Sequence, residues 1–131
     1  MIAENDLRSL ARAKLRDAEA LLRRKRYDGA FYLCGYALEM ALKARICRTL
    51  KWPGFPSSRK EFESLASFKT HDLVILLRLS GIEDKILTHF SVDWAVVKKW
   101  TPEWRYRVVG STSQSDAAAF INAAKRLLRV I

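Results

Sequence analysis

Four polar side chains share one face of a segment that is otherwise apolar. They stand at offsets of 0, 4, 7 and 11 residues, which is one side of an α-helix: Tyr32, Tyr36, Glu39 and Lys43. Glu39 precedes Lys43 in the order that favours an ion pair, and an exposed pair of this kind contributes only about 0.3–0.5 kcal/mol. The pattern indicates either an ordinary salt bridge beside two half-buried tyrosines, or a stripe that meets water, another chain or a partner group of the same fold.

Two histidines are the other candidates for acid–base work. His71 stands between Thr70 and Asp72 at an expected helix start. A histidine there could act as a general base or contact a phosphate group, and the commoner alternative is a residue that only ends a loop. His89 lies beside an apolar stripe, where we expect it to pack.

One short segment combines basic and aromatic side chains: Trp100, Trp104, Arg105, Tyr106 and Arg107. Arginine next to aromatic rings is the composition that stacks on bases and grips phosphate. The alternative is that the tryptophans fill the core while Arg105 pairs with a buried carboxylate such as Glu39. Both interpretations can hold together.

Several kinds of site are not indicated. The chain has no glycine-rich phosphate loop, no Gly-x-Ser-x-Gly and no His-Glu-x-x-His sequence. Cys34 and Cys47 would lie roughly 20 Å apart on one helix, too far for a disulfide. They form no metal-ligand spacing with the histidines either. We therefore expect no metal, no cofactor and a reducing, cytoplasmic compartment.

The composition describes one basic domain. The chain has 131 residues, is 50% hydrophobic and carries a formal net charge of +10, so we expect a single domain over residues 1–131. The excess of lysine and arginine lies near both ends. Such a charge favours nucleic acid, a nucleotide or an acidic protein as partner, and the alternative is a solvated basic surface. No apolar run is long enough to predict a transmembrane helix or a signal peptide.

The apolar periodicity predicts five helices. Their approximate ranges are 5–25, 28–50, 71–79, 82–100 and from 115 or 116 onward. The second is apolar on most sides, which predicts a central position, and Gly29 and Gly35 predict close approach of a neighbour. Ser58 and Glu61 match a capping box at a short additional helix. No strand of convincing length is visible, so the fold class is all-α, a single up-and-down bundle of four to five helices.

In several segments the chain resembles the HEPN domain family (higher eukaryotes and prokaryotes nucleotide-binding). The similar segments occur in the same order: Tyr27–Ala30, Gly35–Ala44, Thr70–Leu73, Asp93–Trp94 and Trp100–Tyr106. The resemblance implies a helical bundle that homodimerises and binds nucleotides or RNA. It also implies that the protein accompanies a minimal nucleotidyltransferase in a toxin–antitoxin or defence pair. Other members of the family are metal-independent ribonucleases.

The sequence departs from the ribonuclease pattern of that family, in which arginine precedes histidine with four to six residues between. His71 is preceded at that spacing by Ser64, Leu65 and Ala66. His89 is preceded there by Ile82, Glu83 and Asp84, and no histidine follows Arg105. Without a histidine to move a proton, we do not expect the family's RNA cleavage.

Three hypotheses follow. The first is a HEPN-type nucleotide- or RNA-binding module, companion of a nucleotidyltransferase, whose ligand-binding residues are Tyr36, Glu39, Lys43, Arg105 and Tyr106. The second is a degenerate-motif ribonuclease toxin with catalytic candidates His71, Arg105 and Tyr106. The third is a structural homodimer whose polar stripe is buried in its own interface.

Overall fold

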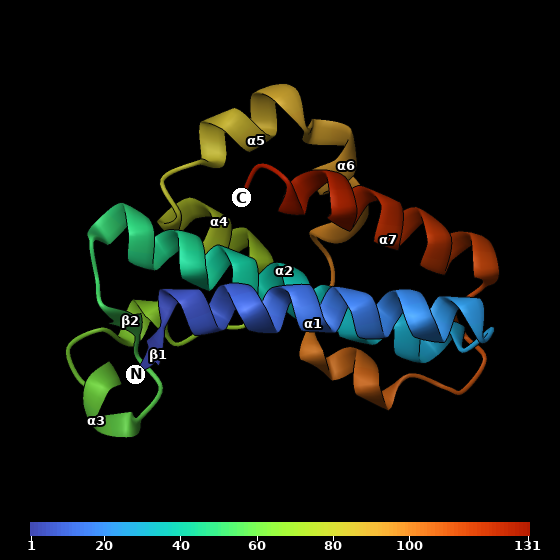
Figure 1. Ribbon diagram of the computed structural model, residues 1–131, viewed down its shortest axis with the longest axis horizontal. Helices are drawn as coiled ribbons and strands as arrows, with labels where there is room; N and C mark the ends of the chain where they lie inside the picture. The colour runs from blue at the N-terminus through green and yellow to red at the C-terminus, as the bar shows by residue number, and fades with distance from the viewer.

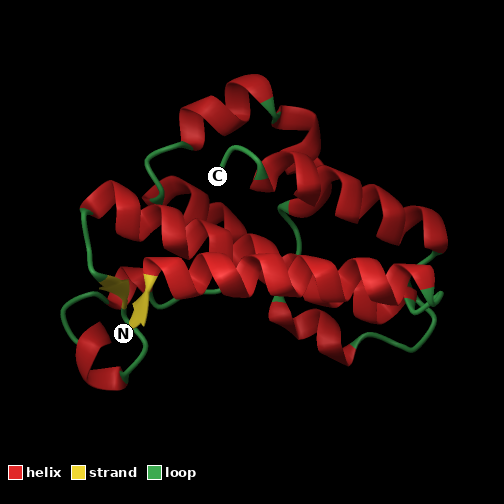
Figure 2. Ribbon diagram, viewed as in Figure 1, coloured by secondary structure: helices red, strands yellow, loops and turns green.

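The computed structural model describes residues 1–131 and consists almost entirely of helices (Figures 1 and 2). The α-helices are α1 (Glu4–Arg23), α2 (Tyr27–Leu50), α3 (Arg59–Phe62), α4 (Leu73–Leu79), α5 (Glu83–His89), α6 (Ser91–Val97) and α7 (Gln114–Leu128). Two 3-10 helices are η1 (Ala66–Phe68) and η2 (Pro102–Tyr106), and two short strands are β1 (Ile2–Ala3) and β2 (Gly54–Phe55). The expected all-α bundle is confirmed, although it contains seven α-helices rather than four to five.

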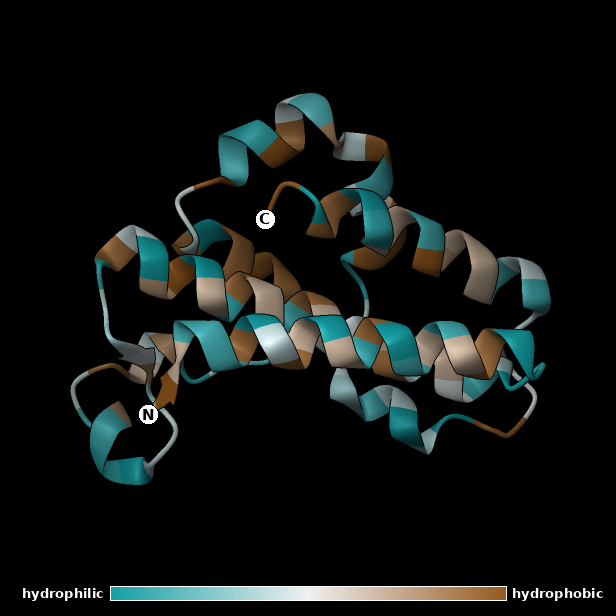
Figure 3. Cartoon of the chain, in the orientation of Figure 1, coloured by the Kyte–Doolittle hydropathy of each residue, from teal (hydrophilic) through white to brown (hydrophobic).

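Helix α2 is the centre of the bundle. It contacts α1, α4, α7, β2 and η2, and Figure 1 shows it antiparallel to α1 along most of its length. The reason is its composition, since small and apolar side chains occur on nearly every side of it. Twelve of its residues are buried, Glu39 among them. Figure 3 shows the hydrophobic residues gathered where the helices face one another, and polar ones along the outer sides.

A glycine on α2 allows the segment after α6 to pack closely. Gly35 and Trp100 are both buried. A Cβ atom built on Gly35 would lie 1.9 Å from Cε2 of Trp100. The indole therefore occupies the space that any other side chain at position 35 would need. This contact places η2, which begins two residues after Trp100, against the middle of α2.

Two of the expected helix boundaries are wrong. The range 82–100 contains two helices, because Phe90 has φ −132° and ψ 27° and interrupts the helix. The apolar spacing of Ile86, Phe90 and Trp94 continues through the break, so the sequence pattern does not reveal it. The third helix begins at Leu73 rather than His71, because Asp72 and not Thr70 is the N-cap.

Smaller differences concern the ends of the chain and the loops. β1 and β2 pair antiparallel, with Ile2 opposite Phe55, a pairing too short for sequence periodicity to indicate. The capping box of Ser58 and Glu61 is confirmed at α3. His89 is exposed and does not pack as expected, because it ends α5 on the outer side of that helix.

Candidate functional site: a cationic cavity beside a buried carboxylate

Glu39 is a buried carboxylate with two different partners. Only 1% of its side chain is exposed. Its Oε2 atom accepts a hydrogen bond from Nζ of Lys43 at 3.2 Å, and its Oε1 atom lies 2.8 Å from Nδ1 of His71. The side chains of Lys43 and His71 are 14% and 64% exposed. The carboxylate is thus satisfied from both sides, as a buried charge must be, and it holds one ring nitrogen of an exposed histidine.

The start of α4 brings His71 to this position. The Asp72 side chain accepts hydrogen bonds from the amides of Val74 and Ile75, and the Thr70 hydroxyl accepts one from the Asp72 amide. These local bonds fix the turn before the helix. His71, directly before the N-cap residue, therefore reaches Glu39 on α2, although the two residues are 32 positions apart in sequence.

Two tyrosines continue the polar face of α2 beyond Glu39. Their hydroxyl oxygens, on Tyr32 and Tyr36, are 3.2 Å apart, and the Tyr36 ring packs edge-on against Trp100 at 4.9 Å. Burial, with the hydrogen bond to Tyr32, raises the pKa of Tyr36 to about 12, and the charge of Arg105 acts in the opposite direction. Tyr36 therefore stays a neutral phenol at physiological pH, within electrostatic reach of both Glu39 and Arg105.

Arg105 comes from η2, whose start is fixed by Thr101 and Pro102. The Thr101 hydroxyl accepts a hydrogen bond from the Glu103 amide, and proline occupies the first helical position. A guanidinium nitrogen of Arg105 donates to the Tyr106 hydroxyl at 3.2 Å, and its Cζ lies 4.7 Å from the centre of that ring. This hydrogen bond raises the pKa of Arg105. Arg105 is exposed and forms no ion pair with Glu39, whose partners are Lys43 and His71. The salt bridge between Arg105 and a buried Glu39, one of the two interpretations of the sequence, is therefore absent.

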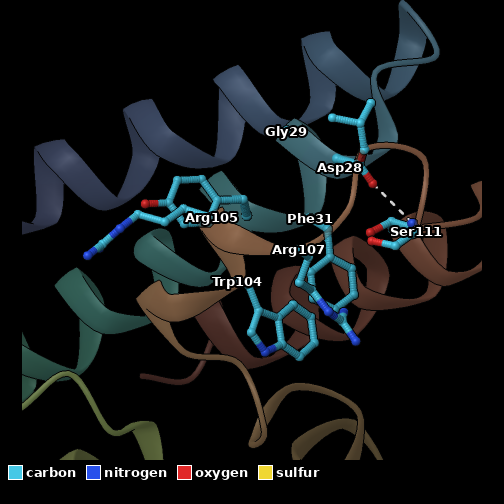
Figure 4. A pocket seen from close by; sticks show the side chains of 10 residues that line it. Asp28, Gly29, Phe31, Trp104, Arg105, Arg107 and Ser111 are labelled. Carbon is cyan, nitrogen blue, oxygen red and sulfur yellow. Dashed lines mark hydrogen bonds between the residues drawn. The ribbon is translucent and has the colours of Figure 1, made fainter.

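Between α2, η2 and the following loop lies a cavity of about 330 Å³. Its wall contains two arginines, three aromatic rings and the carboxylate of Asp28. The residues that line it are Asp28, Gly29, Phe31, Tyr32, Trp104, Arg105, Arg107, Val109, Ser111 and Thr112. Figure 4 shows Asp28 beside Ser111 at one end of this cavity and Arg105 at the other. The cavity is open at the surface, because both arginines are exposed.

Aromatic stacking builds one wall of the cavity. Trp104 stacks on Phe31 with ring centres 4.4 Å apart and an interplanar angle of 20°. Phe31 in turn packs on Phe120 of α7 at 4.0 Å. The guanidinium Cζ of Arg107 lies 4.1 Å from the centre of the Trp104 ring. The cation is thus held in place by a π contact and leaves its N–H donors available.

Asp28 fixes the loop that closes the cavity. Its Oδ2 accepts a hydrogen bond from the Gly110 amide at 2.7 Å, and its Oδ1 accepts one from the Thr112 amide at 3.0 Å. These bonds, that from Gly110 above all, lower the pKa of Asp28. Ser113 then caps α7 by accepting from the Asp116 amide. A residue at the start of α2 thereby determines the course of the loop more than 80 residues later.

The electrostatics of the cavity favour an anion. Arg105 and Arg107 take part in none of the salt bridges of the structure. The carboxylate in the wall, Asp28, already accepts two backbone hydrogen bonds. Two unpaired guanidinium groups beside one satisfied carboxylate leave an excess of positive charge and of N–H donors, which suits phosphate.

The structure divides the residues chosen from the sequence into two groups. Glu39 and His71 meet directly, and Lys43 joins them. Arg105 is the one predicted site residue that lines the cavity. Its five companions do not: Tyr36, Glu39, Lys43, His71 and Tyr106. Nine of the ten lining residues were not predicted to bind a ligand, and the three of these with polar or stacking chemistry of most interest are Asp28, Trp104 and Arg107. The signal for the last two was present, since they belong to the basic and aromatic segment around Arg105.

No group of three or more His, Cys, Asp or Glu side chains is placed to hold a metal ion. Cys34 and Cys47 are both buried and unpaired. None of the helices combines the length and the apolar character that a membrane span requires.

The architecture defines a helical bundle with a cationic cavity between its central helix and a 3-10 segment. The comparison with protein-family models matches residues 5–57 to the HEPN domain. The match covers α1, α2 and β2, less than half of the chain, and it confirms the resemblance to HEPN domains there. Arg105, Tyr106 and His71 lie outside it. At the family level, this supports a module related to nucleotides or RNA.

Searches of curated proteins and of solved structures gave no match to this chain.

Proposed function

We propose that the protein is a HEPN-type nucleotide- or RNA-binding module whose phosphate site is the cavity beside η2. One observation carries the proposal: the guanidinium groups of Arg105 and Arg107 line the same open cavity, and neither forms a salt bridge with a carboxylate. Both donate in the planar, forked geometry that matches phosphate oxygens. The match of residues 5–57 to the HEPN domain supports the same class of ligand.

The remaining residues supply shape and stacking. A volume of about 330 Å³ lies at the lower end of the range for small-molecule sites, which suits a phosphate with its sugar or base. Tyr106, 74% exposed, offers a ring face for a base next to the guanidinium of Arg105. In this proposal Tyr36 positions that element through Tyr32, while Glu39 and Lys43 form the polar face of α2 that continues from the cavity.

The test is equilibrium binding of adenosine monophosphate and of a short single-stranded RNA. Arg105→Gln and Arg107→Gln each remove one charged donor while keeping much of the side chain. We expect affinity to fall about tenfold or more for each, since one charged hydrogen bond contributes about 1.5–3 kcal/mol. The control is Arg59→Gln with Lys60→Gln, two exposed cations on α3 at the other end of the molecule (Figure 1). Unchanged affinity in both cavity variants would refute the proposal.

A second candidate function, a metal-independent ribonuclease, is favoured by one observation. Nδ1 of His71 lies 2.8 Å from the buried Glu39 carboxylate, and the ring is 64% exposed. A carboxylate that orients an exposed imidazole is the arrangement of a general base. The test is loss of intact RNA in a chelator-containing buffer. Cleavage that His71→Ala and Arg105→Gln both abolish would establish this candidate, and intact RNA after long incubation would eliminate it.

The proposal also covers the protein partner, the compartment and the oligomeric state. We place it as the companion of a nucleotidyltransferase in a cytoplasmic toxin–antitoxin or defence pair, and as a homodimer, on the strength of the HEPN resemblance. Co-purification with a nucleotidyltransferase encoded beside it and the mass in solution are the tests. If Glu39→Ala changed the mass in solution without changing nucleotide affinity, the polar face would belong to a dimer interface and the third hypothesis would stand.

A further inference from the structure

Four consecutive cations stand at the end of α1 and in the turn that leads to α2: Arg23, Arg24, Lys25 and Arg26. All four are exposed, and none takes part in a salt bridge. The turn is tight, because Lys25 has φ +60° and the Arg26 amide donates to the Leu21 carbonyl at 2.9 Å. The cations are therefore concentrated at one end of the bundle.

A second cavity, of about 290 Å³, connects this turn with the phosphate site proposed above. Lys25, Arg26 and Tyr27 line it. Four residues line both cavities: Asp28, Gly29, Val109 and Thr112. The two hollows are thus neighbours along the loop that Asp28 holds in place, with two exposed arginines at one end and two exposed cations at the other.

We infer that this second cavity is a subsite for the phosphodiester backbone of a single-stranded RNA whose neighbouring nucleotide occupies the first cavity. The inference rests on the proposed function and deepens it, because it assigns a second set of phosphate contacts, those of Lys25 and Arg26, to an RNA strand. A strand carries phosphates at regular intervals, so it can meet Arg105 and Arg107 first, and Lys25 and Arg26 next. A positively charged groove with aromatic rings is the usual form of a single-strand site.

The shape argues for a nucleic acid strand over other polyanions. The cations line adjoining hollows rather than a flat face, whereas an anionic membrane surface needs cations that reach one plane. The same hollows are lined by three aromatic residues, Tyr27, Tyr32 and Trp104. Aromatic rings stack on nucleic-acid bases, and an acidic peptide has no bases to stack on them. An RNA strand uses both kinds of contact.

The experiment is a length series of oligoadenylates measured by fluorescence anisotropy, from one nucleotide to eight. The variant is Lys25→Gln with Arg26→Gln, and the control with the same change of charge is Arg59→Gln with Lys60→Gln. In the subsite variant, we expect octamer affinity to fall about tenfold and monomer affinity to stay the same. The logarithm of affinity should also depend less steeply on the logarithm of salt concentration, by about 1.4 for two lost phosphate contacts.

The possible outcomes separate this inference from the proposed function. Octamer affinity that is unchanged in the subsite variant, or that falls equally in the control, overturns the inference. So does equal competition from polyglutamate or from vesicles that contain phosphatidylserine. A wild-type protein that does not bind the monomer, yet binds the octamer through Lys25 and Arg26, refutes the first cavity as a nucleotide site and supports the strand subsite alone.

Discussion

The Oε1 atom of Glu39 lies 2.8 Å from Nδ1 of His71, although the carboxylate is buried on α2 and the imidazole projects from an exposed loop. The other carboxylate oxygen accepts from Lys43 at 3.2 Å. One buried charge therefore links the central helix to the start of α4. This link also keeps the second ring nitrogen of His71 available at the surface.

Replacing Glu39 should destabilise the fold far more than replacing His71. Glu39→Gln leaves the largely buried Lys43 ammonium without its carboxylate, and we expect a loss of about 2 kcal/mol in the free energy of unfolding. His71→Ala removes an exposed partner and should cost less than about 1 kcal/mol. Urea unfolding measures both. Adding Lys43→Met to Glu39→Gln should recover part of the loss, and equal losses for Glu39→Gln and His71→Ala would contradict this account.

Gly35→Ala should be one of the most damaging single substitutions in α2. The new methyl group would lie within 2 Å of the Trp100 indole, which is itself buried. We expect a loss of about 3 kcal/mol in the free energy of unfolding, measured by thermal or urea unfolding.

Gly29→Ala is the matched control for that substitution. Its methyl group would meet only Cδ1 of Leu21, at 3.2 Å, and a flexible side-chain end can move aside. Alanine is the better helix former by about 1 kcal/mol, so this variant should be neutral or more stable. A Gly35→Ala protein as stable as the wild type would mean that Trp100 does not pack against α2 as described.

Asp28→Asn should weaken the loop between η2 and α7 in a pH-dependent manner. The pKa of Asp28 is lowered from the ordinary value of 3.8, so its stabilisation is fully present above that pH and is lost as the pH falls through the folded-state pKa. We expect the variant to be about 1–2 kcal/mol less stable at pH 7. The difference from the wild type should shrink below pH 3.8.

Asp17→Asn is the control for the Asp28 prediction, because Asp17 is exposed and forms no salt bridge. It should leave the free energy of unfolding at pH 7 unchanged. Amide hydrogen exchange of Gly110 and Thr112 should quicken in Asp28→Asn alone. Unaltered exchange at both amides would show that the aspartate does not hold the loop.

The sequence predicts the fold better than the site. The long helices follow from the apolar spacing, and the closeness of Gly35 to a neighbour follows from a glycine inside a helix. The break at Phe90 does not, because the apolar residues keep their spacing through it. The contact of Asp28 with Gly110 and Thr112 joins residues more than 80 positions apart, and no local pattern encodes it. The polar stripe of α2 was visible, whereas its partner His71 was recognisable only as a histidine near a helix start.

The most direct test of the central claim is a titration of the protein with adenosine monophosphate, followed by the four tryptophan indole signals in a proton–nitrogen NMR spectrum. Trp104 lines the proposed phosphate site, Trp52 lies at the other end of the molecule near Met1, and Trp94 is buried in the hydrophobic core. We predict that the Trp104 indole and the Arg105 and Arg107 amides shift with one saturating curve while Trp52 and Trp94 stay in place. Shifts centred on Trp52, or no shifts at millimolar nucleotide, would contradict the assignment of this cavity as the phosphate site.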